Sequence, residues 1–496
     1  MPRLKIIPDD STKSWMYDEA TCSQFVYLYG LLTERYQGCC KALYDVYGET
    51  SKDNLIIGSL DIGAGTSDVM ICQYDYIPKN PSLLKPNPLF WESFDTAGDD
   101  MLRFLISNVL LQGEDGILEQ LLLAKGEDLA TIRGKMFAFV GRNQIDHSFR
   151  FKNLRRDFNL QVLVPVMYEF LRLLAKGEGS RDVTYNDIYN STEPSVEVCN
   201  EFEKIFNISI KEMRWQYSRK VMSKYVSRSL DKLLMKIASI MNAYHCDIVL
   251  LSGRPTSLTP IRQTFLKYAP VAPNRLIMLN DYNVGDWFPF IDKKRRCINN
   301  SKSIVPIGAM IGYLASNAGG YNGLSIDMTL LAEKLAPTTD YFIVNDTTVQ
   351  ANSCFITPKN NQGSIIVNSF PVYIGCKQFN LSLYPVRPFY VLDVNRESIV
   401  EKHKKKATSH ENLNILCAEY IEKLTQHTPL TFLFQRDDYR ENCELIQIEE
   451  VVDANGNQLP PLDFQLSVQS LNDPECYWLD SGVFDINSGI NEKQIP

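Results

Sequence analysis

Residues 55–76 read LIIGSLDIGAGTSDVMICQYDY, and the interpretation of the whole chain starts from them. An apolar run ends in Asp61, and a second apolar run begins at Val69 after glycines, an alanine, a threonine and a serine. No helical pattern follows the glycines, so the stretch predicts two antiparallel strands joined by a glycine-rich turn. The Walker A loop and the Rossmann turn both lead from a strand into a helix, so neither describes this segment.

The composition of this turn is suited to binding an anion. Glycine allows the backbone to approach a ligand closely, and successive N–H groups in a turn can point at one anion. Asp61, at the end of the strand, is placed to hold hydrated Mg²⁺ or to orient an attacking water. An ordinary glycine-rich hairpin with two solvated aspartates explains the same letters. The predicted phosphate contacts are Gly63, Ala64, Gly65 and Thr66, with Asp68 supporting the turn.

The segment DIGAGTSDV, residues 61–69, resembles a phosphate motif of the superfamily of actin, sugar kinases and heat-shock chaperones. It is similar to the second phosphate motif, D-x-G-G-G-T-x-D, with Ala64 at the usual middle glycine. A helix is predicted over residues 16–36, and DEAT at 18–21 resembles the helix opening that precedes this hairpin in the chaperones. The resemblance implies an α/β fold with an actin-like (ribonuclease H-like) ATPase core.

Two later segments fit the same superfamily. TAGDD at 96–100 matches in part the Gly-Gly-x-Asp stretch that opens the helix after the hairpin sheet, which places Gly98 at the site. SGRP at 252–255 follows an apolar strand and resembles the adenosine motif, with Ser252 in the first glycine position. The resemblance implies that Gly253 and Arg254 border the adenosine, although a plain strand–turn–helix explains the pattern by itself.

A narrower resemblance covers the stretch from Ser252 to Leu314, which is similar to the SrfB-type bacterial virulence factors. The SGRP turn and the aromatic DWFPF segment at 286–290 are the basis of this match. Together the resemblances cover roughly residues 16–316. They imply Mg-ATP as the cofactor, ATP and ADP as ligands, and a role in bacterial virulence.

The composition argues against several other classes of function. The chain has 496 residues, 45% of them hydrophobic and 22% charged, as in a soluble globular protein. Its net charge of −8 gives no basic field, so we expect no nucleic-acid partner. No apolar run approaches 18 residues, so we expect no membrane span. Twelve cysteines without a C-x-x-C pair predict free thiols in a reducing cytoplasm rather than a zinc site.

The pattern predicts two domains, with the ATPase core at residues 1–320 and an α+β domain at 321–496. GGYNG at 319–323 is the predicted linker. No catalytic motif is found in the second domain. Its predicted elements are strands at 341–345, 365–368, 371–375 and 389–393, a helix over about 397–425, and a hairpin turn at Asn455-Gly456.

Several elements of the first domain are predicted from composition and periodicity. They are a proline-rich loop at 77–90, a mainly helical region at 112–215, one long helix at 222–244, and a closely packed helix at 303–316 containing Gly308, Ala309 and Gly312. The superfamily places a mobile lobe in the helical region, with basic residues beside the adenine. Arg155 or Arg156 fits that role, and a solvated helix face fits equally well.

One part of the superfamily core is missing from the predicted elements. The core has two lobes, and the first normally begins with a phosphate hairpin of its own. Only about fifteen residues precede the first predicted helix, so we expect a partial core: the C-terminal part of a larger ATPase, or a chain completed by a second polypeptide. Half of the phosphate cradle would then be absent, and hydrolysis would be slow at most.

These observations leave two principal functions open. The first is nucleotide binding with slow Mg-dependent ATP hydrolysis, in which Asp61 organises metal and water. The second is a non-enzymatic interaction protein whose ATPase fold is a degenerate scaffold. A small-molecule kinase is a third reading, but it requires a catalytic acid and an acceptor site that the sequence does not reveal.

Overall fold

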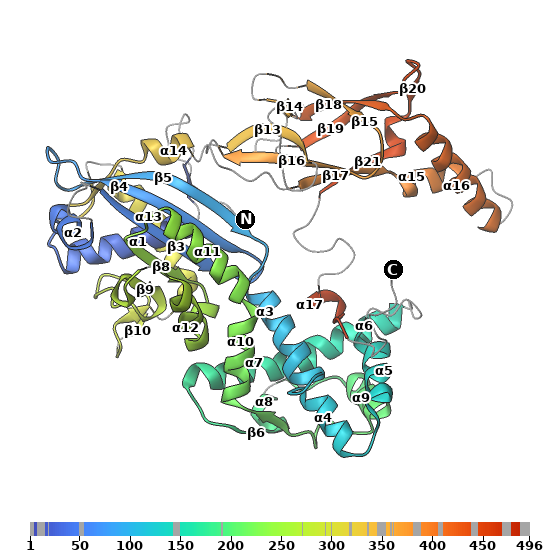
Figure 1. The fold of residues 1–496 in the computed structure, drawn as a ribbon, viewed down its shortest axis with the longest axis horizontal. Coiled ribbons are helices and arrows are strands. Elements are labelled where there is room, and N and C mark those ends of the chain that lie inside the picture. The colour runs from blue at the N-terminus through green and yellow to red at the C-terminus, as the bar shows by residue number, and fades with distance from the viewer. Residues whose placement is uncertain are drawn as a thin grey trace. The chain divides into compact units, whose positions relative to one another are not determined.

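The chain forms two compact units. The first comprises residues 1–330 and 475–496, and the second residues 331–474 (Figure 1). The computed structural model describes residues 4–6, 15–17, 19–48, 54–141, 149–189, 192–269, 271–292, 294–298, 300–316, 320–334, 337–344, 354–357, 360, 362–379, 388–404, 410–437, 445–468 and 478–486.

The first unit is built on a mixed sheet with the strand order β12-β5-β4-β3-β8-β9. The predicted hairpin is confirmed, since β3 and β4 pair antiparallel with Ile62 opposite Ser67. On its other side β3 pairs in parallel with β8. The strands are β3 (Asn54–Ile62), β4 (Ser67–Asp75), β5 (Leu83–Phe94), β8 (Ile248–Ser252), β9 (Leu276–Met278) and β12 (Ser325–Ile326).

Helices cover both faces of this sheet. Successive side chains of β3 point to opposite faces, so two neighbouring residues contact different helices. The Ser59 hydroxyl donates to the Ala20 carbonyl of α1 (Glu19–Glu34) at 3.0 Å. A Cβ atom at the neighbouring Gly58 would instead lie 3.2 Å from Met241 of α11 (Asp231–Ala243). α1 and α11 therefore lie on opposite faces (Figure 1). Burial on both sides explains why the burial of β3 does not alternate, since its last six residues are all buried.

The last core helix, α13 (Ile304–Ser316), packs closely on α1, as its small residues predict. A Cβ atom at Gly308 would lie 2.1 Å from the Cys22 carbonyl oxygen. That separation is impossible for a side-chain carbon, so the approach of the two helices requires glycine at this position.

The predicted loop at 77–90 is wrong for residues 83–90, which belong to β5. The prolines of this stretch suggested a loop because proline cannot donate to a ladder. However, β12 pairs with β5 only at Leu83 and Leu84. Pro86 and Pro88 therefore lie where that edge of β5 has no neighbouring strand among the described residues, and they pair with β4 on the other side.

A helical lobe follows β5, as predicted, but the expected single helix at 222–244 is two helices. It is divided at Leu230, whose backbone leaves the helical conformation at φ −114° and ψ 7°. The longer helices of the lobe are α3 (Gly98–Leu105), η1 (Ile106–Leu111), α4 (Ile117–Ala124), α5 (Leu129–Val140), α6 (Phe149–Phe158), η2 (Asn159–Leu163), α7 (Val164–Lys176), α9 (Val196–Phe206) and α10 (Arg219–Ser229).

The helix that runs from Arg150 to Lys176 is long and apolar enough to span a membrane by length and composition alone. It combines α6, η2 and α7, and 61% of its most apolar window is buried inside the protein. The core helix of a soluble protein meets the same criterion. It is the one such helix in the described part of the chain.

The end of the chain differs from the predicted two-domain division. Residues 478–486 belong to the first unit rather than to the predicted domain at 321–496. The first unit also continues to residue 330 and includes β12, so the predicted boundary at 320, with its linker at 319–323, differs as well. Phe484 is fully buried in the core of the first unit, and its N–H donates to the Val140 carbonyl at 2.8 Å. The second unit is therefore inserted between two segments of the first.

The second unit contains two antiparallel sheets, of order β14-β13-β16-β17-β21 and β15-β18-β19-β20. The predicted strands and the turn at Asn455-Gly456 are confirmed, and the predicted helix at 397–425 is two helices. The elements are β13 (Pro337–Val344), β14 (Cys354–Ile356), β15 (Gln362–Val367), β16 (Val372–Phe379), β17 (Pro388–Val394), α15 (Arg396–Lys404), α16 (His410–Gln426), β18 (Leu430–Asp437), β19 (Leu445–Val452), β20 (Gln458–Leu459) and β21 (Phe464–Val468).

The packing of α13 on α1 gives a test of the fold. We predict that Gly308→Ala lowers the free energy of unfolding of the first unit by about 1–3 kcal/mol, since the added methyl group meets backbone. All five tryptophans lie in that unit, so tryptophan fluorescence during urea unfolding reports on it directly.

The matched control is Gly134→Ala in α5, where no atom lies within 4 Å of the added Cβ. Its unfolding free energy should rise by about 0.5–1 kcal/mol, because alanine favours the helix. Equal effects of the two substitutions would contradict the close contact.

Candidate functional site

The candidate site lies at one edge of the sheet of the first unit, where β3 and β8 end. Asp61 pairs in register with Asp68 of β4 on one side and with Ser252 of β8 on the other. The carboxyl ends of parallel strands are the usual place for a ligand in an open α/β sheet. The hairpin turn and the SGRP turn therefore emerge side by side.

The start of α3 joins the same place. The Gly98 N–H donates to the Gly63 carbonyl at 3.0 Å, and the Asp99 N–H donates to the Ala64 carbonyl at 2.8 Å. A Cβ atom at Gly98 would lie 2.9 Å from the Gly63 oxygen and 3.3 Å from the Pro255 side chain. TAGDD, the hairpin turn and the SGRP turn therefore touch one another at a glycine.

Gly253 makes the closest approach in the site. Its φ is +91°, and a Cβ atom there would lie 2.0 Å from the Ile62 carbonyl oxygen and 2.8 Å from Oδ1 of Asp61. Only glycine fits, which explains the glycine of the SGRP turn. Asn280, which the sequence analysis did not identify, donates to the Gly253 carbonyl at 3.0 Å. No local pattern marks Asn280, because its partner lies on another turn.

The predicted residues differ in how far they reach solvent. Ala64, Gly65 and Arg254 are exposed, and the other predicted glycines and Thr66 are partly exposed. Asp61 is 8% exposed and Asp68 is 2% exposed. Thr66 is tied to the turn, since its hydroxyl donates to Asp68 at 3.3 Å. The structure thus presents the backbone of the turn outward and holds both carboxylates beneath it.

A buried polar layer from α1 supports the site, and the sequence analysis missed it. The hydroxyls of Ser23 and Ser252 lie 3.3 Å apart. The Gln24 amide donates to the Ser59 hydroxyl at 2.9 Å and accepts from the Tyr74 hydroxyl at 2.7 Å. Polar residues on a fully buried helix were the available signal, since a helix with all faces buried is normally apolar.

The pKa of Asp61 is raised from 3.8 to about 7. Burial is the largest cause, because it disfavours the charged carboxylate, and the nearby Glu19 and Asp68 add repulsion. A hydrogen bond from Ser252 acts in the opposite direction. A carboxyl group that titrates near neutral pH is suited to hold a cation or to exchange a proton.

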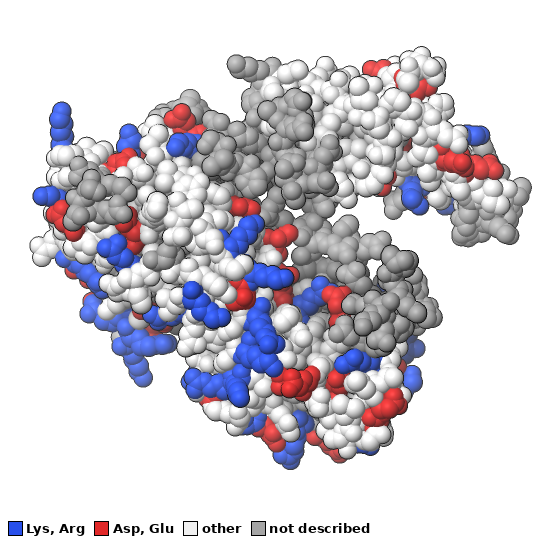
Figure 2. Space-filling model, in the orientation of Figure 1, with Lys and Arg blue, Asp and Glu red and all other residues white. Residues whose placement is uncertain are grey.

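The charged groups around the site are of two kinds, candidate metal ligands and basic side chains near the sheet. Within the described residues, no group of three or more histidine, cysteine, aspartate or glutamate side chains could hold a metal alone. Figure 2 shows Lys and Arg gathered over α10 and α11, and the Lys236 ammonium lies 4.9 Å from the ring of Phe94 at the end of β5. Lys236 of α11 thus lies beside the end of β5, while Asp61 and Asp68 are buried beneath the turn.

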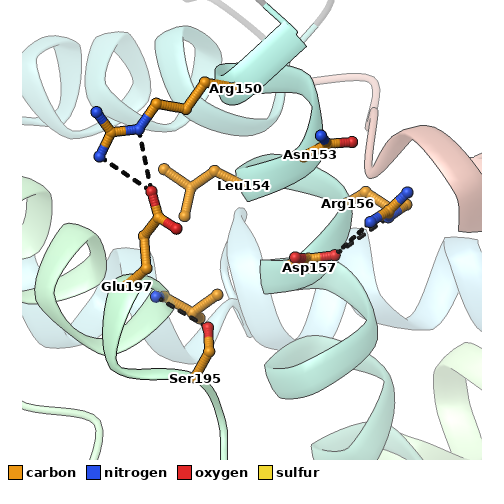
Figure 3. A pocket seen from close by; sticks show the side chains of 8 residues that line it. Arg150, Asn153, Leu154, Arg156, Asp157, Ser195 and Glu197 are labelled. Atoms are coloured by element: carbon orange, nitrogen blue, oxygen red, sulfur yellow. Dashed lines mark hydrogen bonds and ion pairs between the residues drawn. The ribbon is translucent and has the colours of Figure 1, made fainter.

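A separate cavity of about 390 Å³ lies between α6 and the start of α9 (Figure 3). Its charged residues pair with one another: Arg150 with Glu197 and Arg156 with Asp157, each at 3.0 Å. Of the two arginines predicted beside the adenine, Arg156 lines this cavity. Arg155 is buried and donates to the Ser481 carbonyl at 2.8 Å, so its role is to hold the end of the chain.

The fold and the site together define a mixed α/β protein with a glycine-rich turn at the carboxyl end of its sheet. A family model described as "Virulence factor SrfB" matches residues 6–485. The chain therefore belongs to the SrfB virulence factor family. No curated protein matches the sequence.

The pKa of Asp61 gives a prediction about stability. The folded form holds this proton more tightly than the unfolded form, so Asp61 destabilises the fold increasingly as pH rises from about 4 to about 7. Asp61→Asn removes the effect. We predict equal stability of the two proteins near pH 4, and an advantage for the variant that reaches roughly 4 kcal/mol above pH 7.

Urea unfolding followed by tryptophan fluorescence between pH 4 and 8 measures this difference. Asp45→Asn, at an exposed carboxylate of α2 (Cys40–Tyr47), is the control and should show no such trend. A constant difference between wild type and Asp61→Asn across this range would mean that Asp61 is ionised in the fold at low pH.

Proposed function

We propose that this member of the SrfB family binds Mg-ATP where the hairpin turn, the start of α3 and the SGRP turn meet. The main support is this convergence. Three segments far apart in sequence, each predicted from its own motif, lie in contact at Gly63, Gly98 and Gly253. A chance glycine-rich hairpin gives no reason for the other two motifs to pack against it.

The strand order supports the superfamily assignment as part of the same proposal. Along the chain, the hairpin strands β3 and β4 precede β8. Strand β8 ends in the SGRP turn and pairs in parallel with β3. This is the arrangement that an actin-like core needs to bring a phosphate motif and an adenosine motif to one ligand. The exposed backbone of Ala64 and Gly65 would contact phosphate, and Gly253 and Arg254 would border the adenosine.

The two carboxylates of the site, Asp61 and Asp68, would require a cation to accompany the nucleotide. Metal-free ATP is a polyanion and would be repelled by ionised Asp61 and Asp68. Mg²⁺ is commonly held by one or two carboxylates together with phosphates and waters, and Asp61 would be its ligand. Because only ionised Asp61 would bind the metal, affinity for Mg-ATP should increase as pH passes through about 7.

Hydrolysis would be slow in this proposal. Asp61 would hold Mg²⁺ and orient the attacking water. The described residues contain one phosphate hairpin of this type, whereas the superfamily uses two. A second polypeptide that supplies further phosphate contacts is part of the proposal, as is a cytoplasmic location.

The alternative function is an interaction protein with a degenerate ATPase fold. One observation favours it. Asp61 and Asp68 are almost fully buried, and the approach of Gly253 to Asp61 leaves little room for a hydrated ion. In that case the second unit would bind a protein partner, and the sheet of the first unit would serve only as a scaffold.

A thermal-shift titration distinguishes the two functions. We predict that Mg-ATP and Mg-ADP stabilise the wild type, by roughly 2.7 kcal/mol when the ligand is at 100 times its dissociation constant. Asp61→Ala should abolish the shift by removing the metal ligand. ATP with EDTA should give no shift, because the carboxylates repel the free nucleotide.

Asp45→Ala serves as the control for the substitution, since Asp45 is an exposed carboxylate of α2 and belongs to none of the three segments of the site. Its response to Mg-ATP should equal that of the wild type. The absence of a shift in the wild type, or an equal shift in Asp61→Ala, would favour the scaffold.

A further inference from the structure

The end of the chain contacts the helical lobe in the manner of a bound peptide. Residues 478–486 follow the second unit in sequence, but Trp478, residues 481–484 and Ile486 are buried in the first. Apart from the short helix α17 (Trp478–Ser481), the segment has no secondary structure and belongs to none of the sheets. It is therefore held by side chains of the lobe and by the backbone hydrogen bond from Phe484 to Val140, rather than by a strand ladder.

The lobe recognises the main chain of this segment. Arg155 donates to the Ser481 carbonyl at 2.8 Å, Asn159 to the Trp478 carbonyl at 3.3 Å, and Gln112 to the Asp485 carbonyl at 2.8 Å. These donors come from α6, η2 and the end of η1. Polar side chains that bind backbone carbonyls are a common way of holding an extended peptide, because the contact does not depend on the peptide's own side chains.

Two buried aromatic side chains and one glycine of the segment determine which peptide the lobe accepts. Trp478 is 4% exposed and Phe484 is 0% exposed, with their ring centres 5.6 Å apart. Gly482 has φ +66°, and a Cβ atom there would lie 2.5 Å from the Arg155 carbonyl oxygen. At the rim, Arg103 of α3 forms an ion pair with Asp485 at 3.3 Å. The groove thus fits a peptide with two aromatic anchors around a glycine, followed by an acidic residue.

The contact also contains two polar groups that are not satisfied. Oδ1 of Asn159 and Nε1 of Trp478 are buried and have no hydrogen-bond partner among the described residues. Each such group loses its hydrogen bonds to water, as Nε1 of Trp287 also does elsewhere in the first unit. They weaken the attachment of the segment relative to a fully satisfied core.

We propose that the helical lobe has a peptide-binding groove, formed by α3, η1, α5, α6 and η2, in which residues 478–486 are a reversibly bound ligand supplied by the same chain. Release of the segment leaves the second unit joined to the first by one connection instead of two. The inference is independent of nucleotide binding, because it involves none of the proposed nucleotide contacts.

The test uses the full chain and a fluorescein-labelled peptide with the sequence of residues 478–486, WLDSGVFDI. Phe484→Ala removes the deepest anchor and should free the groove. Fluorescence anisotropy should then show peptide binding at least ten-fold tighter for this variant than for the wild type, because a tethered segment competes at an effective concentration on the order of millimolar. A peptide carrying Gly482→Val should not bind.

Leu462→Ala is the matched control, since Leu462 is a large apolar side chain that is 77% exposed and lies in the second unit. It should behave like the wild type. Gly482→Ala in the full chain is a second way to release the segment. The proposal is overturned if the labelled peptide binds neither variant, or if both variants unfold the lobe as judged by tryptophan fluorescence.

An exchange between two molecules would also be visible. A concentration-dependent dimer of the wild type that Phe484→Ala abolishes would assign the groove to the segment of a second copy, and would overturn its assignment to the same chain.

Discussion

The double pairing of β3 is the constraint on which the rest of the first unit depends. Its hydrogen bonds to β4 and β8 fix the register that places Asp61 between Asp68 and Ser252. A shift of one residue would turn every side chain of β3 to the opposite face. Ser59 would then leave α1, and Gly58 would leave α11. The two helix layers and the site are consequences of one register.

That register also lowers the stability of the fold, because it buries the carboxyl group of Asp61. A carboxylate held between two strands loses hydration, and its pKa near 7 measures the loss. Buried groups with perturbed pKa values concentrate at functional sites, although structural networks produce them as well. The glycines beside Asp61 bring three segments into contact at one edge of the sheet, and this contact is the observation on which the proposed nucleotide site depends.

The sequence was informative where structure is determined locally. The hairpin turn, the SGRP turn and the small residues of α13 were predictable, because each depends on neighbouring residues in the chain. Non-local features were not. β5 contains Pro86 and Pro88, and it is a strand only because β12 leaves that edge unpaired. The return of Phe484 to the helical lobe has no local signal, and neither has the partnership of Asn280 with Gly253.

Hydrogen exchange measured by mass spectrometry, with and without Mg-ATP, is the sharpest test of a nucleotide site shared by the three segments. We expect amides of the hairpin turn (63–66), the start of α3 (98–99) and the SGRP turn (252–254) to become protected together, at one nucleotide concentration, while the cavity beside Arg150 does not respond. Protection confined to that cavity, or no protection anywhere, would rule out the shared site.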